Sequence, residues 1–149
     1  MRILKIEEVT DVIDIDLIVE LEKNCFGEMA WSKELLISTI IGQFKHVYIL
    51  KDNEKILGYL ILQIILDEGE IERIGIHSDY RRQSFAKYLL IDVLKETAIT
   101  DCYLEVNENN EPAKYLYHSC GFEIIGRRSG YYQDGNDAIM MKWKRNCNE

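Results

Sequence analysis

The segment from residue 81 to residue 87 has the clearest capacity for chemistry in this sequence. It joins an apolar stretch, 71–76, to a run in which apolar residues recur at helical spacing. A loop of small and basic residues that opens a helix presents free backbone N–H groups and the positive end of the helix dipole, which is what a pyrophosphate requires. We therefore expect an anion-binding loop made of Arg81, Arg82, Gln83, Ser84, Phe85, Ala86 and Lys87.

Two residues farther along the chain could move protons. Glu105 lies in a short apolar strand between Leu104 and Val106, whose side chains face away from it, so its carboxylate can point into a cleft. A carboxylate can take a proton from an amine, and the phenol of Tyr117, with a reference pKa of about 10, can return one. The residues alone leave simpler explanations open. A glutamate in a short strand is more often merely exposed, and Tyr115 and Tyr117 cannot share a helix face, so at least one of them is expected in the core.

Tyr131 and Tyr132 lie together in a loop that contains glycine and aspartate. Adjacent exposed aromatic residues often mark a binding surface, and a loop clamp with one ring buried is an equal alternative. The histidines at positions 46, 77 and 118 have no carboxylate or cysteine partner at ligand spacing, so we expect no metal site.

Size and composition restrict the class of protein. At 149 residues the chain is expected to form one domain, 1–149, and a content of 47% hydrophobic and 30% charged residues is typical of a soluble globular protein. The net charge of −8 disfavours direct nucleic-acid binding; it suits a cationic ligand or simply favours solubility. The apolar runs are too short to span a membrane, no secretory leader is visible, and the four cysteines form no C-x-x-C pair. We therefore expect a cytoplasmic protein without a membrane partner.

Hydrophobic periodicity and turn residues predict a mixed α/β protein with the element order β-α-α-β-β-β-α-β-α-β-β. Ser32 is expected to cap the second helix, which Gly42 ends. Pro112 and Gly121 are expected at the start and the end of the last helix, and residues 67–69 form the turn before the fourth strand. The predicted strands are 2–7, 46–51, 55–66, 70–76, 102–106, 122–128 and 137–143, and the predicted helices are 11–24, 32–41, 85–97 and one from the first turn around Pro112 to about Cys120.

Segments along nearly the whole chain resemble one family. The 81–86 segment is similar to the (Arg/Gln)-x-x-Gly-x-(Gly/Ala) signature of the GNAT superfamily of N-acetyltransferases. Residues 104–122 resemble the L-E-V-x-x-x-N-x-x-A-x-x-L-Y-x-x-x-G-F block of the ribosomal-protein-alanine N-acetyltransferases within it. Residues 127–132 and 137–141 resemble that family's R-R-x-Y-Y and D-A-I-x-M ending, with one extra residue before the tyrosines. The segment from Cys25 to Ser32 is similar to its A-F-x-W-S, again with a small insertion.

This resemblance implies the GNAT fold, a mixed, mostly antiparallel central sheet flanked by helices, and acetyl-CoA as the co-substrate. It also implies that Glu105 is the general base and Tyr117 the general acid. The cofactor contacts implied are the strand residues Ile74, Gly75 and Ile76, the loop 82–87 with Arg81 at its entrance, and Asn110; Trp31, Tyr131 and Tyr132 are expected on the substrate side. One position departs from the pattern, because Ser84 replaces the glycine that lets a backbone approach a ligand closely.

The function implied is transfer of an acetyl group from acetyl-CoA to the N-terminal α-amine of a protein, in particular the N-terminal alanine of a small-subunit ribosomal protein. Two alternatives remain open: acetylation of a small amine or of a lysine side chain, and a silent acyl-CoA-binding module. Retention of Glu105 and Tyr117 disfavours the silent module, whereas Ser84 favours it.

Overall fold

The computed structural model describes residues 2–9 and 15–146. Its strands are β1 (Leu4–Val9), β2 (Lys45–Asp52), β3 (Lys55–Ile65), β4 (Glu68–Ile76), β5 (Asp101–Asn107), β6 (Glu123–Arg128) and β7 (Ala138–Lys144). Its helices are α1 (Ile15–Phe26), α2 (Lys33–Ile40), α3 (Phe85–Glu96) and α4 (Glu111–Ser119), with 3-10 turns η2 (Gly27–Met29) and η3 (Ser78–Tyr80). The order of strands and α-helices predicted from the sequence is confirmed.

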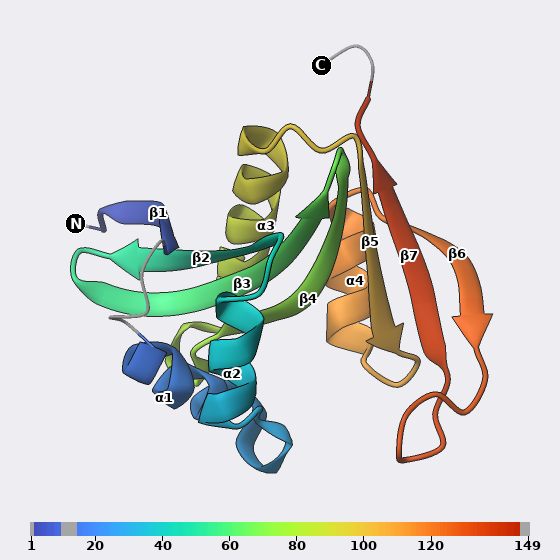
Figure 1. Ribbon diagram of the computed structural model, residues 1–149, viewed down its shortest axis with the longest axis horizontal. Coiled ribbons are helices and arrows are strands. Elements are labelled where there is room, and N and C mark those ends of the chain that lie inside the picture. Colours follow the sequence, from blue (N-terminus) through green and yellow to red (C-terminus); the bar gives the residue numbers. More distant parts are fainter. Residues whose placement is uncertain (1, 10–14, 147–149) are drawn as a thin grey trace.

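The strands form one sheet in the order β1-β2-β3-β4-β5-β7-β6. Neighbouring strands are antiparallel except β4 and β5, which run parallel, so the expected mostly antiparallel sheet is confirmed. In the described chain, β4 and β5 pair through residues 68–70 and 101–103 and no farther. Figure 1 shows the two strands spreading apart beyond that point, with α4 behind the opening. The sheet therefore consists of two parts joined by one short parallel contact.

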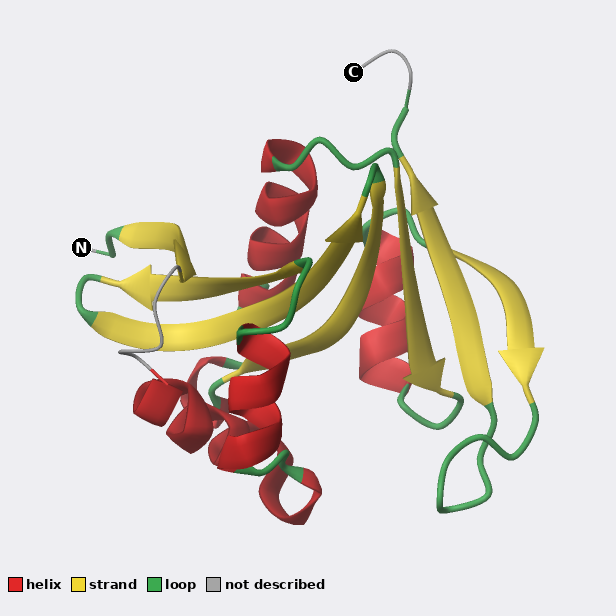
Figure 2. Cartoon of the chain, viewed as in Figure 1, coloured by secondary structure: helices red, strands yellow, loops and turns green. Residues whose placement is uncertain are grey.

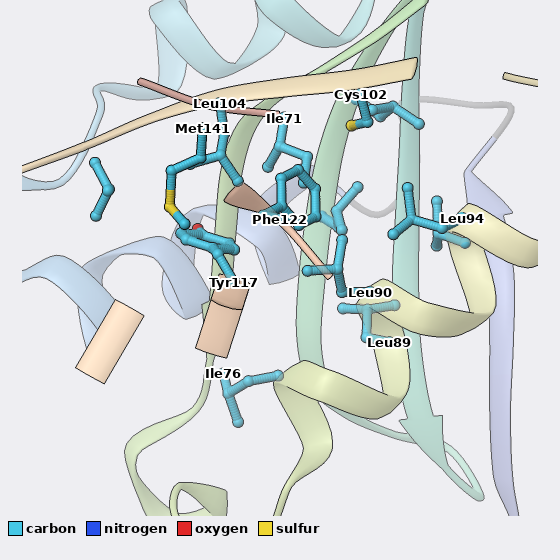
Figure 3. Close-up of a cluster of buried hydrophobic side chains, with 14 of the residues drawn as sticks. Ile71, Ile76, Leu89, Leu90, Leu94, Cys102, Leu104, Tyr117, Phe122 and Met141 are labelled. Carbon is cyan, nitrogen blue, oxygen red and sulfur yellow. The ribbon is translucent and has the colours of Figure 1, made fainter. Parts of the chain in front are cut away.

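Helices cover both faces of the sheet (Figure 2), and each face has its own apolar cluster. Under α3 and α4 lies a cluster that includes Leu90 and Phe122, drawn in Figure 3. Under α1 and α2 lies a second cluster that includes Ile18 and Tyr59. The opening between β4 and β5 therefore lies between two helical layers that are packed independently.

The predicted helix signals act as expected. The Ser32 hydroxyl oxygen accepts a hydrogen bond from the N–H of Leu35 at 3.1 Å and caps α2. Pro112 lies in the first turn of α4, where its missing N–H leaves no helical hydrogen bond unmade. Gly121, with φ of 98°, follows α4 in a conformation that glycine adopts without steric cost.

Some element boundaries differ from those predicted. The first strand is Leu4–Val9 rather than 2–7, because its pairing with β2 fixes it there. The turn before β4 comes earlier than residues 67–69: Leu66 takes a positive φ of 56°, and β4 already begins at Glu68 because residues 68–70 pair with both neighbouring strands. Of the predicted helix 11–24, residues 11–14 lie outside the described residues, and α1 continues to Phe26.

Candidate active site

The opening between β4 and β5 begins after Glu70 and Tyr103, the last residues that pair across it. A β-bulge in β4 lies next to this point: consecutive residues of β3 face Ile71 and Arg73, so Glu72 is an extra residue. A bulge bends its strand and increases its twist, which turns the rest of β4 away from β5. Two strand edges, 72–76 and 104–107, are therefore not hydrogen-bonded to each other.

The edge of β4 presents backbone groups to this opening. The N–H of His77 donates to the carbonyl of Leu57 on β3 at 2.8 Å. Backbone groups alternate in direction along a strand, so Ile74 and Ile76 direct theirs away from β3 and toward the open edge. The Ile76 carbonyl accepts from Arg81 Nε at 3.1 Å and from the Cys25 thiol at 3.3 Å, which leaves its N–H for a ligand.

Gly75, between these two residues, has a packing reason to be glycine. A Cβ added to it would lie 2.9 Å from Cys25 Sγ and 3.2 Å from a ring carbon of Tyr59. A larger residue would therefore push α1 away from β4. The structure brings the predicted residues Ile74, Gly75 and Ile76 together on the open edge.

The loop that connects β4 to α3 has a backbone that favours glycine. Arg82 and Ser84 have φ of 63° and 65°, in the left-handed region. A residue other than glycine in that region costs roughly 1–2 kcal/mol. Ser84 is the N-cap of α3 but its side chain makes no capping hydrogen bond, so the usual benefit of serine at this position is not obtained. The glycine of the signature is thus explained by conformation as well as by closeness to a ligand.

The side chains of this loop face different ways. Arg82, Gln83 and Ser84 are exposed, Ala86 and Lys87 are half-buried, and Phe85 is buried in the cluster beneath α3. Phe85 therefore anchors the loop, while the exposed backbone and cations remain available to an anion.

The guanidinium of Arg81 is hydrogen-bonded to backbone carbonyls of the protein itself. Besides the Ile76 carbonyl, its guanidinium donates to the carbonyl of Cys25 at 3.1 Å. The side chain thus joins the end of α1 to β4 and to the start of the loop. Arg81 lies at the start of the loop, and its side chain is hydrogen-bonded to the backbone there.

Arg2 is a cation at this loop that sequence analysis missed. Its Nη2 donates to Gln83 Oε1 at 3.0 Å, and its guanidinium lies 4.9 Å from the ring centroid of Phe85. The two hydrogen-bonded residues are 81 positions apart in the chain, so no local pattern could have indicated the contact.

Glu105 points to the face of the sheet opposite to α3 and α4. Leu104 and Val106, its neighbours in β5, are buried in the cluster beneath those helices, as the alternation in the sequence predicts. The side chain is 24% exposed, and its Oε1 lies 3.0 Å from Nε of Arg128, the last residue of β6. The sequence contained Arg128 within a motif but gave no sign of this ion pair.

Tyr117 lies on the other face of β5, in the cluster shown in Figure 3. Its ring packs edge-on against Phe122 with centroids 5.8 Å apart, and the side chain is buried. Burial raises the pKa of its phenol above the ordinary value, so the group stays protonated at neutral pH. Tyr115 is 77% exposed, which settles that Tyr117 is the core member of the pair.

The β6–β7 loop borders the Glu105 side of the opening. Tyr131 and Tyr132 pack edge-to-face at 5.1 Å, and Tyr131 is exposed while Tyr132 is half-buried. The Arg128 guanidinium lies 5.7 Å from the Tyr131 ring centroid. Burial, with a smaller effect of the nearby Glu105 carboxylate, raises the pKa of Tyr132. The tyrosine pair is thus brought beside Glu105.

The α1–α2 connection borders the β4 side, and here Trp31 packs rather than projects. The backbone N–H of Trp31 donates to Glu22 Oε2 at 2.7 Å, and the centroid of its ring lies 4.8 Å from the Arg73 guanidinium. Arg73 also donates to the carbonyl of Met29 at 3.2 Å. The connection also exposes a large apolar side chain, Met29, which sequence analysis did not select.

The face that carries Glu105 is rich in carboxylates. Burial, together with the nearby Glu72 and Glu105, raises the pKa of Glu70. Glu72, the bulge residue, forms an ion pair with Lys45. Glu72 and Glu105 thus each have a cation beside them, and Glu70 is the carboxylate of the three for which no ion pair is recorded among the described residues.

Asn110 has a structural role in addition to any ligand contact. Its side-chain oxygen accepts from the N–H of Ala113 at 3.2 Å and caps α4, which leaves the amide nitrogen unused by this cap. Among the described residues, no group of three or more His, Cys, Asp or Glu side chains is placed to hold a metal ion. No helix within 2–9 and 15–146 is long and apolar enough to cross a membrane.

The sheet thus diverges at its parallel pair of strands, and a loop with exposed backbone groups and the exposed cation Arg82 follows β4. The chain belongs to the acetyltransferase (GNAT) family, whose model matches residues 15–122.

Within that family the chain is similar to enzymes named for one substrate. The ribosomal protein bS18-alanine N-acetyltransferase of Escherichia coli K12 is 34% identical over 117 residues, covering 74% of this chain and 78% of that protein. The same enzyme of Haemophilus ducreyi is 32% identical over 142 residues, covering 85% of this chain and 97% of that protein. The crystal structure of the Escherichia coli ribosomal-protein-S18-alanine N-acetyltransferase superposes with a TM-score of 0.85 over 99% of both chains, at 29% identity.

Proposed function

We propose that this protein transfers the acetyl group of acetyl-CoA to the N-terminal alanine of ribosomal protein bS18. The relatives that carry this name support the substrate. The single observation that carries the chemistry is the position of the Glu105 carboxylate on β5 where this strand no longer pairs with β4, with the Tyr117 phenol on the other face of the sheet. With free thiols at Cys25, Cys102 and Cys120 and a ribosomal substrate, we place the enzyme in the cytoplasm.

Several features along the diverging edges of β4 and β5 are suited to contact acetyl-CoA. The loop 82–87 offers backbone N–H groups and the exposed cation Arg82 to the pyrophosphate. The backbone groups of Ile74 and Ile76 face the space that the pantetheine arm would occupy, and Asn110 lies at the end of α4 with an amide nitrogen to donate. The N–H of Ile76 is suited to stabilise the oxyanion that forms when the thioester carbonyl is attacked.

The proton transfers follow from the two side chains. Glu105 takes a proton from the α-ammonium, directly or through water, and the free amine attacks the thioester carbonyl. The C–N bond forms, the C–S bond breaks, and the CoA thiolate leaves. Tyr117, whose phenol is protonated at neutral pH, returns a proton to that sulfur. A lysine ammonium costs about 3 kcal/mol more to neutralise than an α-ammonium, from the gap in reference pKa values, so we expect selectivity for the N-terminus.

A peptide with a free N-terminal alanine and an internal lysine tests the substrate. After incubation with the protein and acetyl-CoA, fragmentation in the mass spectrometer should locate the acetyl group on the alanine nitrogen. Acetyl found mainly on lysine, or activity on small amines alone, would replace the proposal with one of those alternatives. Binding of acetyl-CoA without any transfer would indicate a silent module.

Substitution tests the assigned base. Glu105→Gln should lower turnover by about 10²–10⁴-fold with little change in acetyl-CoA affinity, because it removes a base and preserves shape. Glu111→Gln is the matched control, since Glu111 is an exposed carboxylate at the start of α4 that pairs with Lys114. Wild-type turnover of Glu105→Gln across a pH series would show that another group is the base.

A further inference from the structure

The ion pair between Glu105 and Arg128 has no part in the chemistry described above. We propose that Arg128 is a positioning residue, which holds one oxygen of Glu105, places a positive charge beside its carboxylate and so directs that carboxylate toward the incoming amine. The proposal rests on the proposed function, because it takes Glu105 as the base.

The fold gives Arg128 a direct route to Glu105. The strand β7 lies between β5 and β6, with Asn107 opposite Ala138 and Ala138 opposite Arg128. Two strand spacings separate β6 from β5, roughly 10 Å, a distance that only a long side chain crosses. Paired residues of adjacent strands share a face, so the guanidinium passes over the position of Ala138, whose methyl group is fully buried and small enough to allow it.

The geometry of the pair restrains the carboxylate at one oxygen. The recorded contact joins Nε of Arg128 to Oε1 of Glu105 at 3.0 Å. This contact limits the directions that the carboxylate can take, so it can hold the carboxylate toward an incoming amine.

Other charged groups lie on the same face as Glu105. Glu70 on β4 and Tyr132 in the β6–β7 loop lie near enough to Glu105 for its charge to contribute to their raised pKa. Lys45 is paired with Glu72 and with Gln63, and Lys142 lies over the ring of Tyr103. Among the described residues, Arg128 is the cation that a recorded ion pair joins to Glu105.

The adjacent arginine offers a matched control. Arg127 carries the same charge one position earlier but pairs with Asp137 at 2.8 Å and with Glu108 at 3.6 Å. Arg128 is more than half exposed and lies at the end of an edge strand, so Arg128→Gln should fold normally, which a thermal melt would verify.

The test is the pH dependence of kcat/KM for an N-terminal alanine peptide. Arg128→Gln should move the acid limb to higher pH by about 0.5–1 unit, since an exposed pair has a reduced effect. Turnover should then fall about three- to tenfold on that limb and much less at alkaline pH. Arg128→Lys should restore most of the shift, because it keeps the charge, and Arg127→Gln should leave the limb in place. Carbon NMR of the Glu105 carboxyl group, assigned with Glu105→Gln, should show the same displacement of its titration midpoint in the absence of substrate.

The outcomes separate the two proposals. If Glu105→Gln abolishes turnover but Arg128→Gln moves neither the acid limb nor the NMR midpoint, the role of Arg128 is refuted while Glu105 remains the base. If Glu105→Gln is fully active, Glu105 is not the base, and the assignment in the proposed function is refuted. Arg128→Gln added to Glu105→Gln should have no further effect on the pH profile, and an equal effect in both backgrounds would also refute positioning through Glu105.

Discussion

Replacing Glu22 by glutamine is expected to lower the free energy of unfolding by about 3–5 kcal/mol. Glu22, in α1, is 0% exposed. Its carboxylate accepts hydrogen bonds from the Trp31 N–H at 2.7 Å, from the Tyr59 hydroxyl, and from Arg73 Nε and Nη2 at 3.1 and 2.6 Å. The group therefore joins α1, the α1–α2 connection, β3 and β4 at one point.

The magnitude follows from what glutamine cannot do. It keeps the shape of the side chain, but one oxygen becomes an NH₂ group that faces N–H donors in either orientation. It also leaves the charge of Arg73, whose side chain is 18% exposed, without its counter-ion. A domain has a total stability of about 5–15 kcal/mol, so the loss is a large share of it. For a chain of this size it corresponds to a fall in Tm of roughly 6–20 °C.

Denaturant unfolding followed by circular dichroism measures this difference. Glu20→Gln is the matched control on the same helix, because Glu20 is exposed and lies 3.8 Å from Lys23; its effect should stay within about 0.5 kcal/mol. Adding Arg73→Met to Glu22→Gln should recover part of the loss, since no unpaired charge then remains buried. A loss below about 1 kcal/mol for Glu22→Gln, or no recovery in the double variant, would refute the reasoning.

Further predictions concern Ser84, Tyr117 and the net charge of the chain. Ser84→Gly removes a positive φ of 65° from a side-chain-bearing residue and should keep or improve acetyl-CoA affinity in calorimetry; a large loss would show that the serine hydroxyl is a required ligand. Tyr117→Phe should retain peptide binding and slow turnover by about 10²-fold. Because burial raises the pKa of Tyr117, the native protein keeps a proton that the unfolded chain loses near pH 10, so stability should fall as pH rises above about 10, less steeply in Tyr117→Phe when denaturant melts are compared. The net charge of −8 should make kcat/KM for a basic peptide fall as salt is raised, with a neutral peptide nearly unaffected in the same assay.

Features of this protein that depend on local sequence could be predicted. Alternation along a strand placed Glu105 opposite Leu104 and Val106, and capping residues located the starts of α2 and α4. Spacing alone could not choose between Tyr115 and Tyr117, because it says only that they face different directions. The choice depends on which face of α4 packs against the sheet, and that is decided by residues distant in the chain.

Contacts between distant segments could not be predicted in the same way. The pair of Arg128 and Glu105 depends on β7 lying between β5 and β6, an order that runs against the order along the chain. Glu22 and Arg73 are 51 residues apart, and each has the appearance of an ordinary surface charge in its own segment. Their partners become evident only when α1 is packed over β4. Charged residues near a site are thus the hardest to interpret from sequence, because their role is set by the strand order.

The proposed base and acid can act beside each other because their proton affinities differ widely. The reference pKa of a tyrosine phenol is about 10 and that of a glutamic acid about 4.3, so a carboxylate does not take the phenol proton. Glu105 and Tyr117 also lie on opposite faces of the sheet at β5: Glu105 pairs with Arg128 on one face, and Tyr117 is buried among apolar residues on the other. On the proposed mechanism, the amine therefore loses its proton on one face and the sulfur regains one on the other.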